Sequence, residues 1–279
     1  MSYITEKNKY IIINSKKTAY RELGQGKSEI PLVMLTHLAA TLDNWDPKLI
    51  DLIAENNHVI LLELPGAGAS MGNVGESIEK MAEKAITIIK YLGYNKINLL
   101  GLSMGGMVAQ EIVRADNKLV NKLILAGTAY KGGEGIKNII PVTFKHIING
   151  LIHRVDPKRY IFYNHNQKGK KDAEIILGRM AARKDEYKDK KMAVKGFIGQ
   201  LKAIKKWGKS SKDDLSFINI PTLIVNGDKD MMVPTSNSYY MHDKIKGSHL
   251  IIYPDSGHGS IFQYAEKFAG DLLEFIKKV

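Results

Sequence analysis

The hydrophobic positions of this 279-residue chain follow two periods that alternate along most of its length. Two apolar runs near the N-terminus, at 10–14 and 18–23, are predicted to be strands. Continuous apolar runs, which are typical of strands buried on both faces of a parallel sheet, follow at 30–36, 58–64, 96–101, 120–128, 220–228 and 248–254.

Stretches with helical spacing separate these runs. In the clearest of them, 77–93, apolar residues such as Ile78, Met81 and Ala85 recur on one face, and Gly93 marks the end of the helix. Other helices are predicted at 46–56, 105–115, 236–245 and 260–278. Strands that alternate with helices predict a mostly parallel sheet that is covered on both faces.

The alternation stops between about Lys131 and Phe217, where the sequence pattern is typical of helices and predicts no clear strand. Because predicted core strands stand on both sides, this segment is an insertion and not a terminal domain. We therefore expect residues 1–130 and 218–279 to form one α/β core, interrupted by a helical insertion at 131–217. A chain of this length can bury a large single core.

The net charge of +12 is concentrated in the insertion. Between Lys131 and Ile220 there are 21 Lys and Arg against 9 Asp and Glu, and the rest of the chain is neutral. The lysines are scattered and lack the interleaved aromatic residues of a nucleic-acid-binding motif, so no nucleic-acid partner is predicted. A solvated lysine-rich surface is the favoured interpretation, and attraction of an anionic substrate or an acidic partner is the alternative.

Composition narrows the setting of the protein. The chain has no cysteine, which excludes disulfides, thiolate sites and iron–sulfur clusters and fits a reducing cytosol. The N-terminal segment lacks the pattern of a signal peptide, and no run approaches the ~18 apolar residues of a membrane-spanning helix. We therefore predict a cytoplasmic protein without a membrane span.

One serine stands among glycines directly after a buried run. Residues 101–106, Gly-Leu-Ser-Met-Gly-Gly, match the pattern G-x-S-x-G at a strand-to-helix junction. A serine on such a sharp turn is strained, and small residues two positions before and after it permit close packing. The turn also directs the first N–H groups of the helix to a place where developing negative charge is stabilised. Taken alone, the pattern could be explained by a tight turn. Its position between a buried strand and an amphipathic helix favours Ser103 as a nucleophile.

A serine nucleophile needs a base, and the base needs an acid to orient it. Among the eight histidines, His258 lies between two glycines just past the last predicted strand, at the sheet edge where ligands bind. Asp228 and Asp230 both follow the preceding strand, and either satisfies the chain order Ser, Asp, His. One of the two is expected to stabilise the turn instead.

The sequence resembles the α/β-hydrolase fold family over nearly the whole chain except the insertion. Besides the serine turn, three motifs carry the resemblance. Residues 63–70 (ELPGAGAS) resemble D-x-x-G-x-G-x-S, residues 227–234 (GDKDMMVP) resemble G-x-x-D-x-x-x-P, and residues 256–260 (SGHGS) resemble the histidine loop. The second of these selects Asp230 as the acid.

The resemblance implies an α/β-hydrolase fold, with a mostly parallel eight-stranded sheet flanked by helices. It also implies that residues 131–217 form a helical cap over the active site. Apolar residues of this segment, such as Phe162, Phe197 and Trp207, are candidates either for the core of the cap or for the lining of a substrate pocket.

The sequence departs from the family pattern at two places. Glu63 replaces the usual aspartate, which we interpret as a structural exchange. Residues 36–37, Thr-His, stand where relatives usually have His-Gly.

This second departure bears on the oxyanion hole. An ungapped count from either flank assigns the second oxyanion-hole N–H to Leu38, beside that of Met104, whereas a shifted register assigns it to Ala39. His37 and Ala39 are candidate substrate-pocket residues. A direct role of His37 in acid–base catalysis is disfavoured.

The function that the resemblance implies is a serine hydrolase with Ser103, His258 and Asp230 as the triad and no metal or organic cofactor. Residues 37–46 are similar to a segment of enol-lactone hydrolases, which favours a small carboxylic ester, lactone or thioester as substrate. The alternatives are a cofactor-free haloperoxidase or perhydrolase, a carbon–carbon bond hydrolase, and a ligand-binding receptor on the same fold. The expected partner is a small-molecule substrate, which is anionic if the basic cap attracts it. The sequence leaves open whether the chain forms a homo-oligomer.

Overall fold

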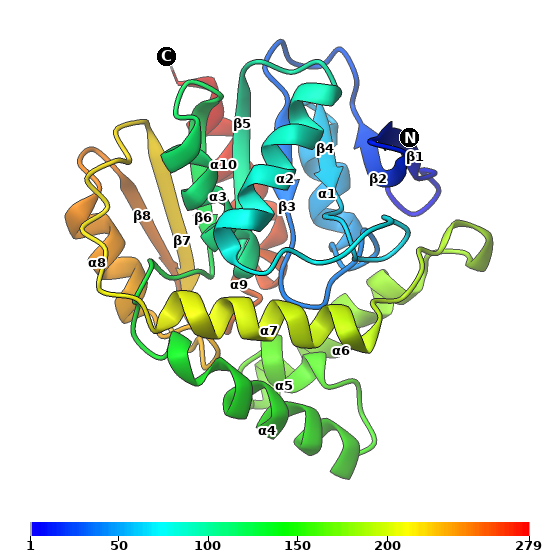
Figure 1. Ribbon diagram of the computed structural model, residues 1–279. Coiled ribbons are helices and arrows are strands. Elements are labelled where there is room, and N and C mark those ends of the chain that lie inside the picture. Colours follow the sequence, from blue (N-terminus) through cyan, green and yellow to red (C-terminus); the bar gives the residue numbers. More distant parts are fainter. Residues whose placement is uncertain (1, 279) are drawn as a thin grey trace.

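One eight-stranded sheet forms the centre of the computed structural model, which describes residues 2–278 (Figure 1). In spatial order the strands are β1 (Lys9–Ile13), β2 (Lys16–Leu23), β4 (Val59–Leu62), β3 (Leu32–Leu35), β5 (Ile97–Leu102), β6 (Val120–Ala126), β7 (Thr222–Gly227) and β8 (His249–Tyr253). β2 is antiparallel to both of its neighbours, and the six strands from β4 to β8 are parallel. The predicted fold class is confirmed.

Helices cover both faces of this sheet. One face packs against α1 (Pro47–Ala54), α9 (Ser260–Gln263) and α10 (Ala265–Lys277). The other face packs against α2 (Ile78–Tyr91), α3 (Met104–Ala115) and α8 (Ser236–Lys244). Because both faces are covered, β3, β4, β5 and β7 are buried along their whole length, which explains their continuous apolar runs.

Two details differ from the sequence prediction. The expected single helix at 260–278 is two helices, because Tyr264 (φ −114°, ψ 37°) leaves the helical conformation between α9 and α10. The Tyr264 ring stacks on Tyr253, and its hydroxyl donates to the Pro254 carbonyl. The apolar period continues across this break, so the pattern does not reveal it. The strands are also shorter than the apolar runs, since residues such as Thr36 leave the sheet to build loops.

The segment between β6 and β7, here called the helical insertion (131–217), contains no strand in the part of the chain that the structure describes. It consists of α4 (Ile139–Ile152), α5 (Lys158–Phe162), α6 (Gln167–Ala181) and α7 (Val194–Gly208), with short 3₁₀ turns at Ile136–Asn138 and Asp185–Tyr187. Figure 1 shows these helices side by side across one end of the sheet. None of the helices in residues 2–278 combines the length and hydrophobicity that crossing a bilayer requires.

Two arginines at the end of α6 fasten the helical insertion to the loop after β3. Arg179 makes a bidentate pair with Asp46 (2.8 and 2.6 Å), which also caps α1. Arg183 pairs with Asp43 (3.0 Å) and donates to backbone carbonyls of the N-terminal segment. Asp43 also pairs with the buried Arg21 (2.7 Å). The loop between β3 and α1 is thereby joined to the insertion by charge-assisted hydrogen bonds.

Candidate active site

Ser103 lies on the sharp turn between β5 and α3. Its backbone has φ 56° and ψ −117°, a conformation that is rare outside glycine. The close packing that permits the turn requires glycine, since a Cβ on Gly101 would lie 2.3 Å from the Gly105 carbonyl oxygen, and one on Gly105 2.2 Å from that of Leu35. The Thr128 hydroxyl donates to the Ser103 carbonyl (2.7 Å) and helps to hold the strained residue in place.

His258 and Asp230 form a buried pair at the ends of the last two strands. Nδ1 of His258 lies 2.7 Å from Oδ2 of Asp230. The other carboxylate oxygen accepts the backbone N–H groups of Met232 (2.8 Å) and Val233 (2.9 Å), which fixes the orientation of Asp230. Asp228 points elsewhere, and its carboxylate accepts the N–H of Ser256 (3.2 Å). Of the two aspartates that the sequence offers, the fold therefore brings only Asp230 to the histidine.

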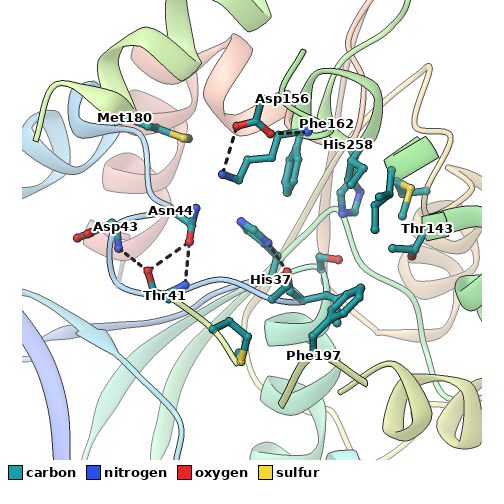
Figure 2. Close-up of a pocket in the computed structure, with 18 of the residues that line it drawn as sticks. His37, Thr41, Asp43, Asn44, Thr143, Asp156, Phe162, Met180, Phe197 and His258 are labelled. Atoms are coloured by element: carbon teal, nitrogen blue, oxygen red, sulfur yellow. Dashed lines mark hydrogen bonds and ion pairs between the residues drawn. The ribbon is translucent and has the colours of Figure 1, made fainter. Parts of the chain in front are cut away.

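Ser103 and His258 line the same cavity, whose volume is about 700 Å³. Gly127 (φ 51°) packs against the histidine loop, because a Cβ there would lie 3.2 Å from the His258 carbonyl oxygen and in contact with the ring. Phe162 of the helical insertion packs on His258, with ring centroids 5.4 Å apart, and its carbonyl accepts the Gly259 N–H (2.7 Å). Figure 2 shows His258, Phe162 and His37 around this cavity. The insertion thus fixes the loop that carries the histidine.

The three backbone N–H groups considered for an oxyanion hole differ in their partners. The N–H of Ala39, a non-glycine residue at φ 62°, donates to Oε1 of Gln200 on α7 (2.8 Å). Among residues 2–278, the N–H groups of Leu38 and Met104 have no hydrogen-bond partner. The free donors are therefore those of Leu38 and Met104, as the ungapped count favours. No sequence pattern identified Gln200, which comes from a distant segment of the chain.

His37 and Ala39, the candidate substrate-pocket residues, both line the cavity. The His37 ring lies edge-on to Phe162, with centroids 4.6 Å apart, and Nδ1 donates to the Leu38 carbonyl (2.8 Å). Burial lowers the pKa of His37 to about 3, so the imidazole is neutral at physiological pH. A neutral, hydrogen-bonded ring suits a structural or pocket-lining position better than proton transfer.

Glu63, the residue that departs from the family motif, is buried beneath the cavity loop. Its two carboxyl oxygens accept the N–H groups of Leu42 (3.3 Å) and Ser70 (3.0 Å). Gly68 provides the space, because a Cβ there would lie 2.1 Å from the Glu63 carboxyl. Burial and, second to it, the neighbouring Asp189 carboxyl of the helical insertion raise the pKa of Glu63 to about 10. Glu63 is therefore protonated at neutral pH.

The lining of the cavity combines apolar and charged side chains. The helical insertion supplies most of the apolar wall, including Ile139, Ile147, Ile161, Phe162, Leu177, Met180, Phe197 and Ile204. The lining also includes the charged residues Asp43, Asp156, Lys158, Arg183, Lys188, Asp189 and Lys191, all but Asp43 from the helical insertion. Trp207 does not reach the cavity, and its indole N–H donates to Glu111 in the core (3.2 Å).

The sheet order, the serine turn and the cavity at the carboxyl ends of the strands define an α/β hydrolase. A family model described as serine aminopeptidase, S33, matches residues 33–263, and the chain belongs to this family of hydrolases. Two curated relatives align along nearly their whole length. The 2-hydroxy-6-oxo-6-(2'-aminophenyl)hexa-2,4-dienoic acid hydrolase of Metapseudomonas resinovorans is 24% identical, over 97% of this chain and 91% of its own. The non-heme haloperoxidase of Rhodococcus erythropolis is 27% identical, over 92% and 95%.

Solved structures agree with this classification. An α/β hydrolase fold protein from Chitinophaga pinensis superimposes with a TM-score of 0.93 and 28% identity, over the full length of both chains. The enol-lactonase from Burkholderia xenovorans LB400 superimposes with a TM-score of 0.77 and 18% identity, over 97% of this chain and all of its own. At that identity the second likeness concerns the fold alone.

Proposed function

We propose that this protein is a serine hydrolase that cleaves a small carboxylic ester, lactone or thioester through an acyl-enzyme. The observation that carries the proposal is the buried His258–Asp230 hydrogen bond of 2.7 Å, whose histidine lines the same cavity as the strained Ser103. A serine and a base on one cavity, with an acid hydrogen-bonded to the base, are the parts that nucleophilic acyl transfer requires.

In the proposed mechanism, the Ser103 hydroxyl attacks the substrate carbonyl while Nε2 of His258 takes its proton. Asp230 accepts a hydrogen bond from the Nδ1–H of His258, which selects the tautomer that leaves Nε2 free as the base. The N–H groups of Leu38 and Met104 stabilise the oxyanion of the tetrahedral intermediate. His258 then protonates the departing alkoxide or thiolate, which leaves as an alcohol or thiol as the acyl-enzyme forms. Water, deprotonated by the same imidazole, hydrolyses the acyl-enzyme and regenerates Ser103.

The cavity supports a substrate with an apolar portion. Its apolar lining suits an acyl or ring group, and Lys158 and Lys191, which also line it, are available to an anionic portion of the substrate. If these lysines select anions, an anionic ester will be turned over faster than a neutral ester of equal size. Salt will reduce the difference, because it screens exposed charges. Equal turnover of both esters at low and high salt would contradict this part of the proposal.

A fluorophosphonate probe tests the mechanism directly. We expect the wild-type protein to gain the mass of one phosphonyl group on Ser103 and to lose ester hydrolysis in parallel. Ser103→Ala should not be labelled. Asp230→Asn should be labelled much more slowly, whereas Asp228→Asn, the matched control, should behave as the wild type. A wild-type protein that resists labelling would overturn the catalytic proposal and favour a ligand-binding role.

The named activities of the relatives provide the competing reactions. A panel of short to medium acyl esters, lactones and thioesters should be measured beside a vinylogous diketone. A further arm should measure halogenation that depends on hydrogen peroxide. Turnover of the diketone alone would reassign the protein as a carbon–carbon bond hydrolase. Halogenation without hydrolysis would reassign it to the perhydrolase group.

A further inference from the structure

Helix α4 of the helical insertion exposes apolar side chains to solvent and buries polar ones. Phe144, Ile148, Leu151 and Ile152 are 39, 51, 68 and 69% exposed. Their spacing of four, three and one positions places them on one helical face, here called the α4 outer face. The polar residues Thr143 and His146 of the same helix are buried instead. An ordinary surface helix shows the reverse arrangement.

The α4 outer face lies at the periphery of the molecule. Figure 1 shows α4 as the helix of the insertion farthest from the sheet, with its outer side uncovered. Its inner side contributes Ile139, Thr143 and Ile147 to the wall of the cavity. The helix therefore separates the cavity from the surroundings and is apolar toward both. A contiguous apolar face of this kind on a monomer indicates an interaction surface.

Charge decides between the possible occupants of this face. Residues 136–155 contain Lys137, Lys145 and Arg154 but no acidic residue, and Lys145 stands on the outer face itself. A second copy of the chain would bring two such basic faces, and two molecules of net charge +12, into contact. An anionic bilayer instead attracts the cations and accepts the apolar side chains between its headgroups.

We propose that the α4 outer face docks this protein peripherally on anionic lipid bilayers. Phe144, Ile148, Leu151 and Ile152 enter the interface, and Lys145 and its neighbouring cations contact lipid phosphates. This docking is independent of the reaction proposed above, because none of the four apolar residues lines the cavity.

Co-sedimentation with vesicles tests the proposal. The full chain is mixed with vesicles of phosphatidylcholine alone or of phosphatidylcholine with phosphatidylglycerol, at low and high salt. We expect binding to the anionic vesicles that salt weakens. The double variant Leu151→Asn/Ile152→Asn should partition at least about ten-fold less, and Lys145→Glu should lose the preference for anionic lipid. Ile12→Asn, at a 63% exposed position on β1, is the matched control and should bind as the wild type.

Three outcomes would overturn the proposal. They are no binding of the wild type to either vesicle, equal binding of the double variant, and a dimer that the double variant dissociates without any vesicle binding. Thermal melting and turnover of a soluble ester should be unchanged in the double variant, which shows that it is folded. If neither the wild type nor any variant hydrolyses esters but the wild type still binds vesicles, the proposed reaction is contradicted and the proposed docking is not.

Discussion

Gln200 connects the helical insertion to the proposed oxyanion hole, and its replacement by leucine gives a sharp test of that connection. Its side chain is buried and accepts the N–H of Ala39, the residue that follows the proposed donor Leu38. Ala39 has φ 62°, a conformation that costs a non-glycine residue about 1–2 kcal/mol. The hydrogen bond from Ala39 to Gln200 offsets part of this cost.

The magnitude follows from the loss of that bond. Gln200→Leu keeps the approximate volume of the side chain and leaves the half-buried Ala39 N–H without its acceptor, which costs about 1 kcal/mol. The loop can then relax and move the Leu38 N–H away from the developing oxyanion. Deleting an oxyanion donor altogether costs about 10²–10³ in kcat. A displaced Leu38 N–H should cost less, and a loss of about 1 kcal/mol in the stabilisation of the oxyanion lowers kcat about five- to ten-fold.

The assay is steady-state hydrolysis of the best ester, together with the rate of fluorophosphonate labelling. Both kcat and the labelling rate should fall, while KM changes little, because the lost interaction acts in the transition state. Gln200→Glu keeps an acceptor and should retain most of the activity, and Lys202→Ala, on an exposed position of the same helix, is the control. A kcat for Gln200→Leu within about two-fold of the wild type would refute the reasoning.

Three further predictions concern stability. The pKa of Glu63 is about 10 in the fold against an ordinary 4.5, so the free energy of unfolding should fall as pH rises from 4.5 toward 10; Glu63→Gln should flatten this slope in urea titrations across the range. Asp43→Ala leaves two buried arginines without their shared carboxylate and should cost about 3 kcal/mol in the same assay, more than Asp43→Asn. Gly105→Ala places a Cβ against the Leu35 carbonyl and should cost about 2 kcal/mol or more, whereas Gly178→Ala, in open space on α6, should stabilise by up to about 1 kcal/mol.

The sheet and most of its helices could be predicted because burial on both faces imposes continuous apolar runs, and a helix packed on a sheet imposes a period of 3.6 residues. The positions of Ser103 and His258 followed from the same reasoning, since parallel strands end at one edge. Asp230 needed the family motif, because Asp228 has the same chemistry two residues away. The choice between them depends on which carboxylate reaches the histidine, and that distance is a property of the folded loop.

The contacts of the helical insertion could not be predicted. Gln200, Arg179 and Arg183 are ordinary residues of polar helices in the sequence, and their partners lie more than 130 positions away in the chain. Nothing local distinguishes these arginines from the other cations of a segment with 21 Lys and Arg. The exposed apolar face of α4 was hidden for a similar reason, because periodicity identifies a face without showing which side the fold buries.

The loop between β3 and α1 is held by the helical insertion at three points, through Ala39, Asp43 and Asp46. These eleven residues (36–46) and the insertion therefore constitute one exchangeable module, although residues 47–130 of the core separate them. A chimaera that takes only the insertion from a relative would remove the hydrogen-bond partners of two carboxylates and of a strained backbone N–H in the loop. Specificity in this chain should thus change by paired replacement of both segments, and a library that varies either one alone would sample mostly damaged proteins.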